Sequence, residues 1–250
     1  MKARTILPVV AALVVFVVAW QLAVVLGGLQ RSILPPPLLV AERFVEAFAD
    51  GTIQPHLATT LQEIAVGLTV GAVLGLLAGY VMARSPLAER LLSPDIVAAQ
   101  AVPILALAPL LAIWFGPGLL SKVVICALIV FFPVAVSTMV GIRTVDPRLL
   151  ELGRSLRATP RQRLWTIEVP AALPSILGGM RVGVTLAVIG AIVGEWAGAD
   201  RGLGVLILLA QGSLFDIPLL FATLFTIAAI GVALYLLVLM AERRLIGRWR

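Results

Sequence analysis

Residues 142–174 read IRTVDPRLLELGRSLRATPRQRLWTIEVPAALP, the only long polar, arginine-rich interruption in an almost continuously apolar chain. Two helix-start signals lie within it. Asp146 stands before a proline, and Thr159 is followed three residues later by Gln162, the spacing of a capping box. The segment therefore predicts two short helices outside the lipid.

The first of these helices is predicted to be amphipathic, and the second is expected to end before Pro170 and Pro174, which would keep it from continuing into the next apolar segment. The apolar face would carry Leu149, Leu152 and Leu156, and the polar face Arg148, Glu151 and Arg154. The result would be a compact surface knob with an apolar and a charged side, well suited to receiving force from a partner.

The composition on either side of this segment is that of an integral membrane protein. The chain of 250 residues is 61% hydrophobic and only 13% charged, whereas soluble domains are nearer half apolar and a quarter charged. Apolar runs of the length needed to cross a bilayer as helix, about 20 residues, predict six spans in a single transmembrane domain, 1–250. They are residues 6–26, 59–82, 94–115, 119–141, 176–199 and 217–241.

Positive charge predicts the orientation of these spans. If the N-terminus is inside, all of the 19 Lys and Arg residues except Arg31, Arg43, Lys122 and Arg201 fall on the inner side. Because short cytoplasmic loops collect positive charge, both termini and residues 142–174 are expected to be cytoplasmic. The net charge of +6 then reflects topology and anionic lipid rather than nucleic acid.

Several chemistries are excluded by what the sequence lacks. No P-loop motif is present, and the only lysines are Lys2 and Lys122, so the chain has no P-loop ATPase site of its own. Cys126 is the only cysteine, which rules out an internal disulfide, and no metal-ligand motif occurs. Residues 1–26 are expected to be a retained first span rather than a cleaved export signal.

Segments around the spans carry further signals. Residues 31–58 predict a short amphipathic helix at the outer interface, followed by His56 as a polar interfacial residue. The third span is interrupted by prolines, including Pro103, and is expected to kink either beside a pathway or simply in packing.

Glycines recur every four residues in two of the spans, and such spacing lets helix backbones approach closely. They are either ordinary packing surfaces or surfaces on which helices slide. The second span carries Gly67, Gly71, Gly75 and Gly79, and the fifth carries Gly190, Gly194 and Gly198.

An autonomous ion-coupled carrier is the alternative class of function, and it would need ionisable groups within the membrane. The candidates are Glu63, Asp95 and Glu195. Each lies near the end of a span, where a water-facing or cap-like role is the simpler interpretation.

The polar segment resembles the Glu-Ala-Ala signature of bacterial ABC importer permeases, which is Glu-Ala-Ala, three residues, Gly, nine residues and Ile-x-Leu-Pro. This sequence keeps the spacing, with Glu151 at the Glu position and Ile167 to Pro170 as the closing tetrad. It departs where Arg157 stands at the usual glycine, and a non-Gly residue tolerates positive φ poorly.

Further stretches carry the resemblance along most of the chain. VPILALAPLLAIWFGPG at 102–118, FFPVAVSTMVGIRTVDPRLLE at 131–151 and VPAALPSILGGMRVG at 169–183 look like the nitrate, sulfonate and taurine branch. GEWAGADRGLG at 194–204 looks like members that serve riboflavin or the pyrimidine precursor of thiamine.

This resemblance implies an all-α type I importer permease with no enzyme activity or cofactor of its own. A cytoplasmic ATPase dimer would hold ATP and Mg, a second permease subunit would complete the pathway, and an extracytoplasmic binding protein would deliver a small solute. The implied coupling residues are Glu151, Gly153, Arg154, Arg157, Thr159, Arg161, Ile167 and Pro170, although the arginines also fit a merely solvated face. Candidates for the pathway are Gln100, Pro103, Trp114, Glu195, Trp196 and Gln211.

Overall fold

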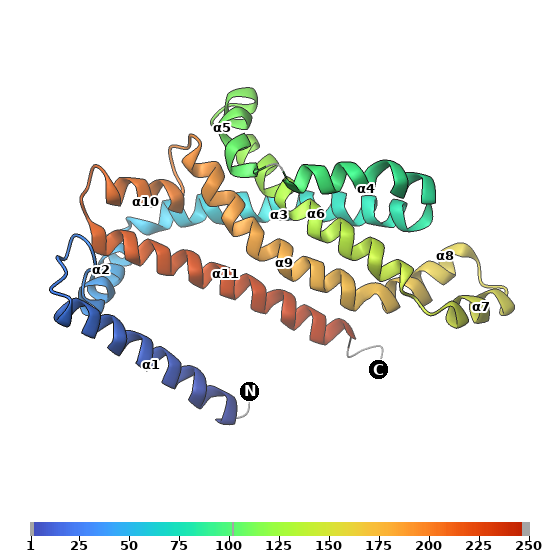
Figure 1. Cartoon of the computed structure of the whole chain (residues 1–250), viewed down its shortest axis with the longest axis horizontal. Coiled ribbons are helices and arrows are strands. Elements are labelled where there is room, and N and C mark those ends of the chain that lie inside the picture. Colours follow the sequence, from blue (N-terminus) through green and yellow to red (C-terminus); the bar gives the residue numbers. More distant parts are fainter. Residues whose placement is uncertain (1–2, 102, 247–250) are drawn as a thin grey trace.

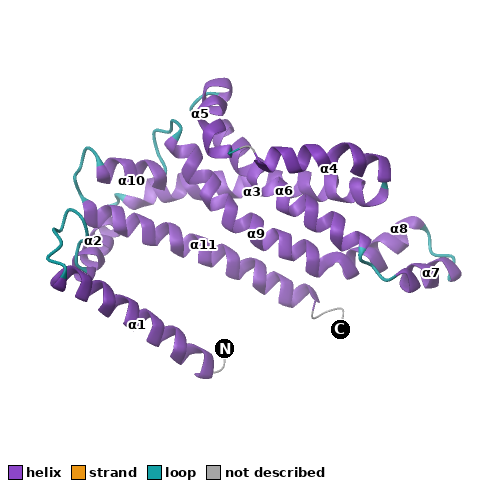
Figure 2. Ribbon diagram, in the orientation of Figure 1, coloured by secondary structure: helices purple, strands orange, loops and turns teal. Residues whose placement is uncertain are grey.

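The computed structural model describes residues 3–101 and 103–246, and every regular element in these ranges is helical (Figures 1 and 2). The helices are α1 (Ala3–Leu26), α2 (Pro37–Ala49), α3 (Ile53–Arg84), α4 (Pro86–Ala101), α5 (Ile104–Phe115), α6 (Leu119–Arg143), α7 (Pro147–Ser155), α8 (Pro160–Arg163), the π-helical turn η1 (Leu164–Glu168), α9 (Val169–Trp196), α10 (Leu203–Gln211) and α11 (Ile217–Ile246).

Long helices α3, α6, α9 and α11 form an elongated bundle (Figure 1). Helices α2 and α10 lie at one end, which we call the α10 end, and α7 and α8 project from the other, which we call the α7 end. Within the described chain, α3, α6, α11 and the continuous helix Pro160–Trp196 are long and apolar enough to cross a membrane. Shorter apolar helices, Val10–Leu26 and Ala106–Phe115, coincide with parts of the first and third predicted spans.

The third predicted span, 94–115, is wrong as a single helix. Helix α4 ends at Ala101, and α5 starts after Pro103, whose extended ψ of 104° places it outside both helices. Residue 102 lies outside the described residues. Because proline has no N–H and clashes with the preceding turn, the interruption is a break rather than the expected kink.

The glycines of α3 pack that helix tightly against α6. A Cβ added at Gly71 would lie 2.5 Å from the carbonyl oxygen of Ala127, and one at Gly79 would lie 2.4 Å from that of Ala135. Gly67 and Gly75 make equally close approaches to α6. These distances fit the packing interpretation, since only glycine leaves room for such a backbone approach.

The second glycine series is only partly correct. Gly190 and Gly194 do face α6, where added Cβ atoms would lie 3.1 Å from Cys126 and 3.0 Å from Lys122. Gly198, however, follows α9, and its positive φ of 138° serves a turn rather than helix packing. The turn continues to Gly202 and leads into α10, a helix that the sequence reading missed.

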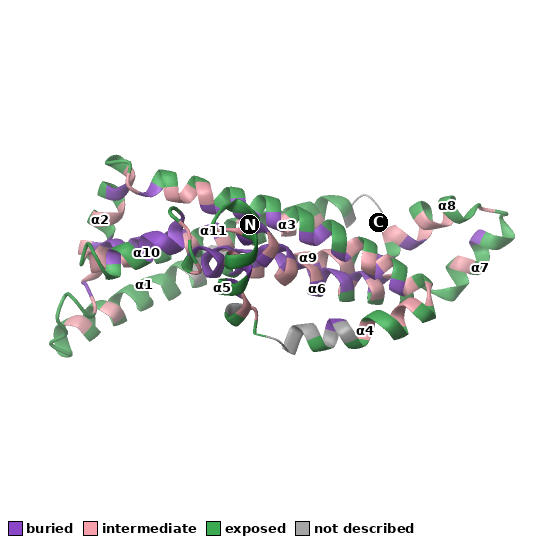
Figure 3. Ribbon diagram, turned by 90° about the horizontal axis from the view of Figure 1, so that it is seen from above, coloured by how far each residue is buried: buried purple, intermediate pink, exposed green. Residues whose placement is uncertain are grey.

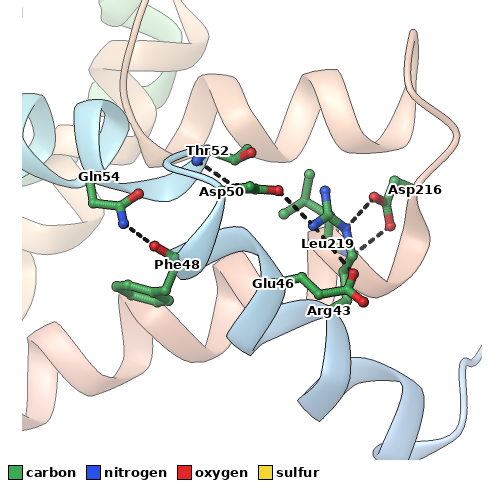
Figure 4. Close-up of polar contacts among 8 residues, drawn as sticks. All are labelled: Arg43, Glu46, Phe48, Asp50, Thr52, Gln54, Asp216 and Leu219. Carbon is green, nitrogen blue, oxygen red and sulfur yellow. Dashed lines mark hydrogen bonds and ion pairs between the residues drawn. The ribbon is translucent and has the colours of Figure 1, made fainter.

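Buried residues concentrate where α3, α6, α9 and α10 meet, whereas α1 and α7 are largely exposed (Figure 3). The predicted helix after the first span is α2, and an ion pair attaches it to the bundle. Arg43 Nε donates to Asp216 Oδ2 at 2.7 Å, and Asp216 Oδ1 accepts the N–H of Leu219 in the first turn of α11 (Figure 4). Asp216 therefore caps α11 while binding α2.

Candidate coupling site

Residues 147–168 are here called the coupling segment. Its two helices, α7 and α8, begin at the two caps that the sequence predicts. Asp146 Oδ1 accepts the N–H of Arg148 at 2.9 Å and starts α7. Thr159 Oγ1 accepts the N–H of Gln162 at 3.3 Å, and Gln162 Oε1 accepts the N–H of Thr159 at 2.8 Å. The two reciprocal bonds form the capping box and fix the start of α8.

A Schellman turn joins the two helices. The N–H of Ala158 donates to the carbonyl of Gly153, and the N–H of Arg157 to that of Arg154, both at 2.9 Å. Arg157 lies at φ +53°, in the left-handed region. The usual glycine is thus absent from a position that needs positive φ, as the motif comparison predicted, and the backbone keeps its turn at some conformational cost.

Gly153 lets α7 fold back onto η1. It is buried, and a Cβ added there would lie 2.8 Å from Cδ1 of Ile167 and 3.2 Å from Cγ of Arg163. The structure therefore brings together Gly153 and Ile167, two motif residues that are separated in the sequence. A side chain at this position would have to displace Ile167 or Arg163, so glycine allows the close approach of α7 to η1.

The remaining motif residues point to solvent. The side chains of Glu151, Arg154, Arg157 and Arg161 are exposed, and in the described part of the chain they form no hydrogen bond or ion pair. Within the described chain, the two caps and Gly153 hold the loop without a side-chain contact from Glu151. Exposed apolar side chains lie on the same segment: Leu149, Leu152, Leu156 and Trp165 are 44%, 55%, 73% and 60% exposed.

The predicted stop at Pro170 is wrong, because the helix runs from Pro160 through to Trp196. The turn η1 explains how. The N–H of Val169 donates to the carbonyl of Leu164, five residues back, so the helix is widened just before Pro170. A π turn removes the i−4 alignment that makes proline clash, and the helix passes Pro170 and Pro174 without ending.

Two ion pairs at the α7 end were not foreseen from the sequence. Glu168, only 3% exposed, accepts from Nη2 of Arg84 at 2.5 Å. Arg143 donates to Glu89 and, through Nη2, to the carbonyl of Met82 at 2.9 Å. The hydrogen bond from Arg143 lowers the pKa of the Glu89 carboxyl. The first pair links the coupling segment to α3, and the second links α4 and α3 to α6.

A buried polar cluster lies at the α10 end, around Glu195. Its carboxylate accepts from Thr60 Oγ1 at 2.5 Å and from the N–H of Gly204 in the first turn of α10. Glu63, 2% exposed, has an Oε2 atom without a hydrogen-bond partner. The cap-like role expected for Glu195 is confirmed, whereas the water-facing role is wrong for both carboxylates because both are buried.

Lys122 and His56 complete this cluster. Lys122, which the charge count placed on the outer side, is 1% exposed within α6, and its ammonium group donates to the carbonyls of Pro117 and Gly198. His56 Nδ1 lies 2.8 Å from the carbonyl oxygen and 3.1 Å from the backbone nitrogen of Gly202. Both residues thus hold the turn between α9 and α10 in place.

Most of the described pathway candidates are exposed on the single chain. Trp114 and Trp196 are 67% and 48% exposed, and Pro103 and Gln211 are exposed as well. Trp196 donates its indole N–H to the carbonyl of Gly204 at 3.0 Å, which fixes the ring beside α10. Gln100 lies in α4, but its side chain is outside the described residues.

Comparison with known proteins places this architecture in a family. Residues 71–247 match the model of the binding-protein-dependent transport system inner membrane component. A riboflavin transport system permease protein from Chloroflexus aurantiacus is 43% identical over 95% of this chain and 88% of its own. A formylaminopyrimidine transport permease protein from Halalkalibacterium halodurans is 38% identical over 86% and 85%.

The fold is also found in solved structures. An inward-facing structure of the MetNI methionine ABC transporter superposes with a TM-score of 0.63 at 20% identity, covering 76% of this chain and 92% of that one. The suspected importer fold is thereby confirmed. The chain belongs to the binding-protein-dependent transport system inner membrane components, as a multi-pass permease of the ABC importers and not as an enzyme.

Proposed function

We propose that this permease carries a vitamin-type heterocycle, riboflavin or a thiamine pyrimidine precursor, into the cell. The similarity to riboflavin and formylaminopyrimidine permeases over most of the chain supports this substrate class. The exposed indole rings of Trp114 and Trp196 are compatible with it, since flat aromatic rings stack on planar heterocycles. Sulfonate, taurine or nitrate transport is the competing assignment.

The coupling segment is proposed as the docking site of a cytoplasmic ATPase dimer. The observation that carries this proposal is its surface: four exposed apolar side chains beside unpartnered Glu151, Arg154, Arg157 and Arg161, on a helix pair fixed by two caps. Large apolar side chains with arginine are typical of interface anchors. ATP and Mg would be bound by the ATPase, whose closure would move the segment and bias the permease between two states.

Two copies of this chain are proposed to form the pathway, with both termini and the coupling segment in the cytoplasm of a bacterial cell. A binding protein would deliver the solute at the α10 end. The charge distribution supports this orientation, since the arginines concentrate at the α7 end. No nucleic acid takes part, and membrane lipid is the remaining partner.

The test is purification of the tagged permease from its host in a mild detergent, followed by reconstitution in liposomes with whatever co-purifies. We expect an ATPase and a binding protein to be recovered, and riboflavin to accumulate only when ATP is supplied. If formylaminopyrimidine inhibits riboflavin uptake, the substrates include pyrimidine precursors. If taurine inhibits it, they include sulfonates. Uptake driven by an ion gradient without ATP would contradict the proposal.

A further inference from the structure

The ion pair between Arg84 and Glu168 is the feature from which we infer a further role. Glu168 ends η1 and is almost completely buried, whereas Arg84 ends α3. Their 2.5 Å contact is the only side-chain hydrogen bond or ion pair from the coupling segment to another helix in the described ranges. The guanidinium also lies 5.5 Å from the centre of the Tyr80 ring, on the preceding turn of α3.

Glu168 lies at an irregular point of the long helix that connects the coupling segment to α9. The helix Pro160–Trp196 is widened at η1, and Pro170 just beyond it lacks the N–H that would close a regular turn. π turns are rare and recur at functional sites. Movement of α7 and α8 would reach α9 through this irregular turn, and the ion pair gives the segment a second connection, to α3.

Helix α3 is suited to receive that movement. Its glycine face packs against α6 from Gly67, near Cys126, to Gly79, near Ala135. A displacement of α3 at its Arg84 end would therefore be passed on to α6. The close packing leaves little room for α3 to bend independently.

We propose that Arg84 and Glu168 act as positioning residues that tie α3 to the start of α9, so that the coupling segment moves both helices together. This inference rests on the proposed coupling to an ATPase. Neither residue is predicted to contact the solute or ATP. Glu168 occupies the unspecified position of the Ile-x-Leu-Pro tetrad, so the motif itself assigns it no role.

The first test uses the reconstituted complex of permease, co-purified ATPase and binding protein, with riboflavin as the transported probe. The variants are Arg84→Glu, Glu168→Arg and the double reversal, which restores an opposite-charge pair. We expect each single reversal to assemble with the ATPase and to hydrolyse ATP. Riboflavin carried per ATP should fall at least about fivefold, the lower end of coupling between separate sites. The double reversal should recover most of it.

A second measurement needs neither a known solute nor a charge reversal. In a Cys126→Ala background, nitroxides on Val81→Cys, exposed on α3, report the distance between two permease copies by double electron–electron resonance. ATP with vanadate should change this distance in the otherwise wild-type protein. The change should shrink in Glu168→Gln. It should persist in the matched control Glu89→Gln, which removes a paired carboxylate at the same end but outside the coupling segment.

The outcomes separate the two proposals. If the wild-type complex couples ATP to movement while the Glu168 and Arg84 variants behave like it, the ion-pair inference is wrong and the proposed function stands. Failure of the double reversal to restore transport would also overturn the inference. If the wild-type permease recovers no ATPase and does not respond to ATP, the proposed function and the inference both fall.

Discussion

Thr60 donates a hydrogen bond of 2.5 Å to Glu195, a residue 135 positions further along the chain. The same hydroxyl oxygen accepts the N–H of Leu203 at 2.8 Å, and the second carboxylate oxygen of Glu195 accepts the N–H of Gly204. Three helices, α3, α9 and α10, are therefore joined through one buried side chain. The α10 end owes its arrangement to this contact.

Glu195→Gln tests the importance of that contact. A glutamine has the same size, but its NH₂ group accepts no hydrogen bond. If the NH₂ group faced Gly204, the Gly204 N–H would lose its acceptor in a buried place, which costs about 1–3 kcal/mol. If it faced Thr60, the hydroxyl would have to donate to the carbonyl of His56 instead, at 3.1 Å, and the bond from α3 to the side chain of Glu195 would be lost. We expect the variant to unfold at a lower temperature in detergent, as measured by tryptophan fluorescence. Glu42→Gln, an exposed change on α2, is the matched control and should leave it unchanged.

Arg157→Gly is expected to stabilise the coupling segment. Arg157 holds φ +53° in the Schellman turn, and the left-handed region costs a non-Gly residue about 1–2 kcal/mol. Glycine should slow hydrogen exchange of the Ala158 amide, whereas Arg157→Val should speed it. Faster exchange in the glycine variant would contradict this explanation of the turn.

The sequence predicts those features that depend on local chemistry. Both helix caps and the packing glycines of α3 follow from residue types at fixed spacings, whereas the positive φ at Arg157 follows from the glycine that the importer signature has there. Those that depend on distant partners were missed. Nothing near Glu168 in the sequence points to Arg84, and the burial of Lys122 follows only from the carbonyls that Pro117 and Gly198 turn toward it.

Proline and glycine show the same limit in the backbone. A proline in an apolar run predicts a disturbance, but not its kind. Pro103 separates two helices, whereas the widened turn at η1 accommodates Pro170. Likewise, Gly198 continues the four-residue spacing of its helix and yet lies in a turn. Tertiary packing decides between such outcomes.

Gly71→Leu should prevent α3 from packing on α6. A Cβ at this position would already lie 2.5 Å from the backbone oxygen of Ala127, and overpacking typically costs about 1–3 kcal/mol even where side chains rather than backbone must move. We expect aggregation or a much lower yield of monodisperse protein on size-exclusion chromatography. Val73→Leu, on the exposed side of the same helix, should behave as wild type. Normal assembly and transport of Gly71→Leu would refute the packing role.

Asp50 should make the junction of α2 and α3 sensitive to acid. Hydrogen bonds from Thr52, whose N–H lies 2.9 Å from Oδ1, together with Arg43, lower the pKa of Asp50. A carboxyl with a depressed pKa stabilises the fold above its unfolded pKa of about 3.9, and this stabilisation is lost as the pH falls through the folded value. The unfolding temperatures of wild type and Asp50→Asn should therefore differ at neutral pH and converge in acid. A difference that grew in acid would contradict the assignment.

Glu151→Lys is expected to uncouple ATP hydrolysis from uptake. Glu151 is exposed on α7 and has no side-chain partner in the described chain, so its reversal should leave the permease inserted and folded. In the proposed contact, a basic group of the ATPase that pairs with Glu151 would instead meet a like charge, and removing one member of a buried interfacial charge pair costs about 2–5 kcal/mol. The measurement is riboflavin uptake per ATP in liposomes, beside the amount of ATPase that co-purifies. The control is Glu42→Lys, an equal change of charge at the α10 end, which should leave both unchanged. Wild-type uptake by Glu151→Lys would show that this carboxylate takes no part in the contact.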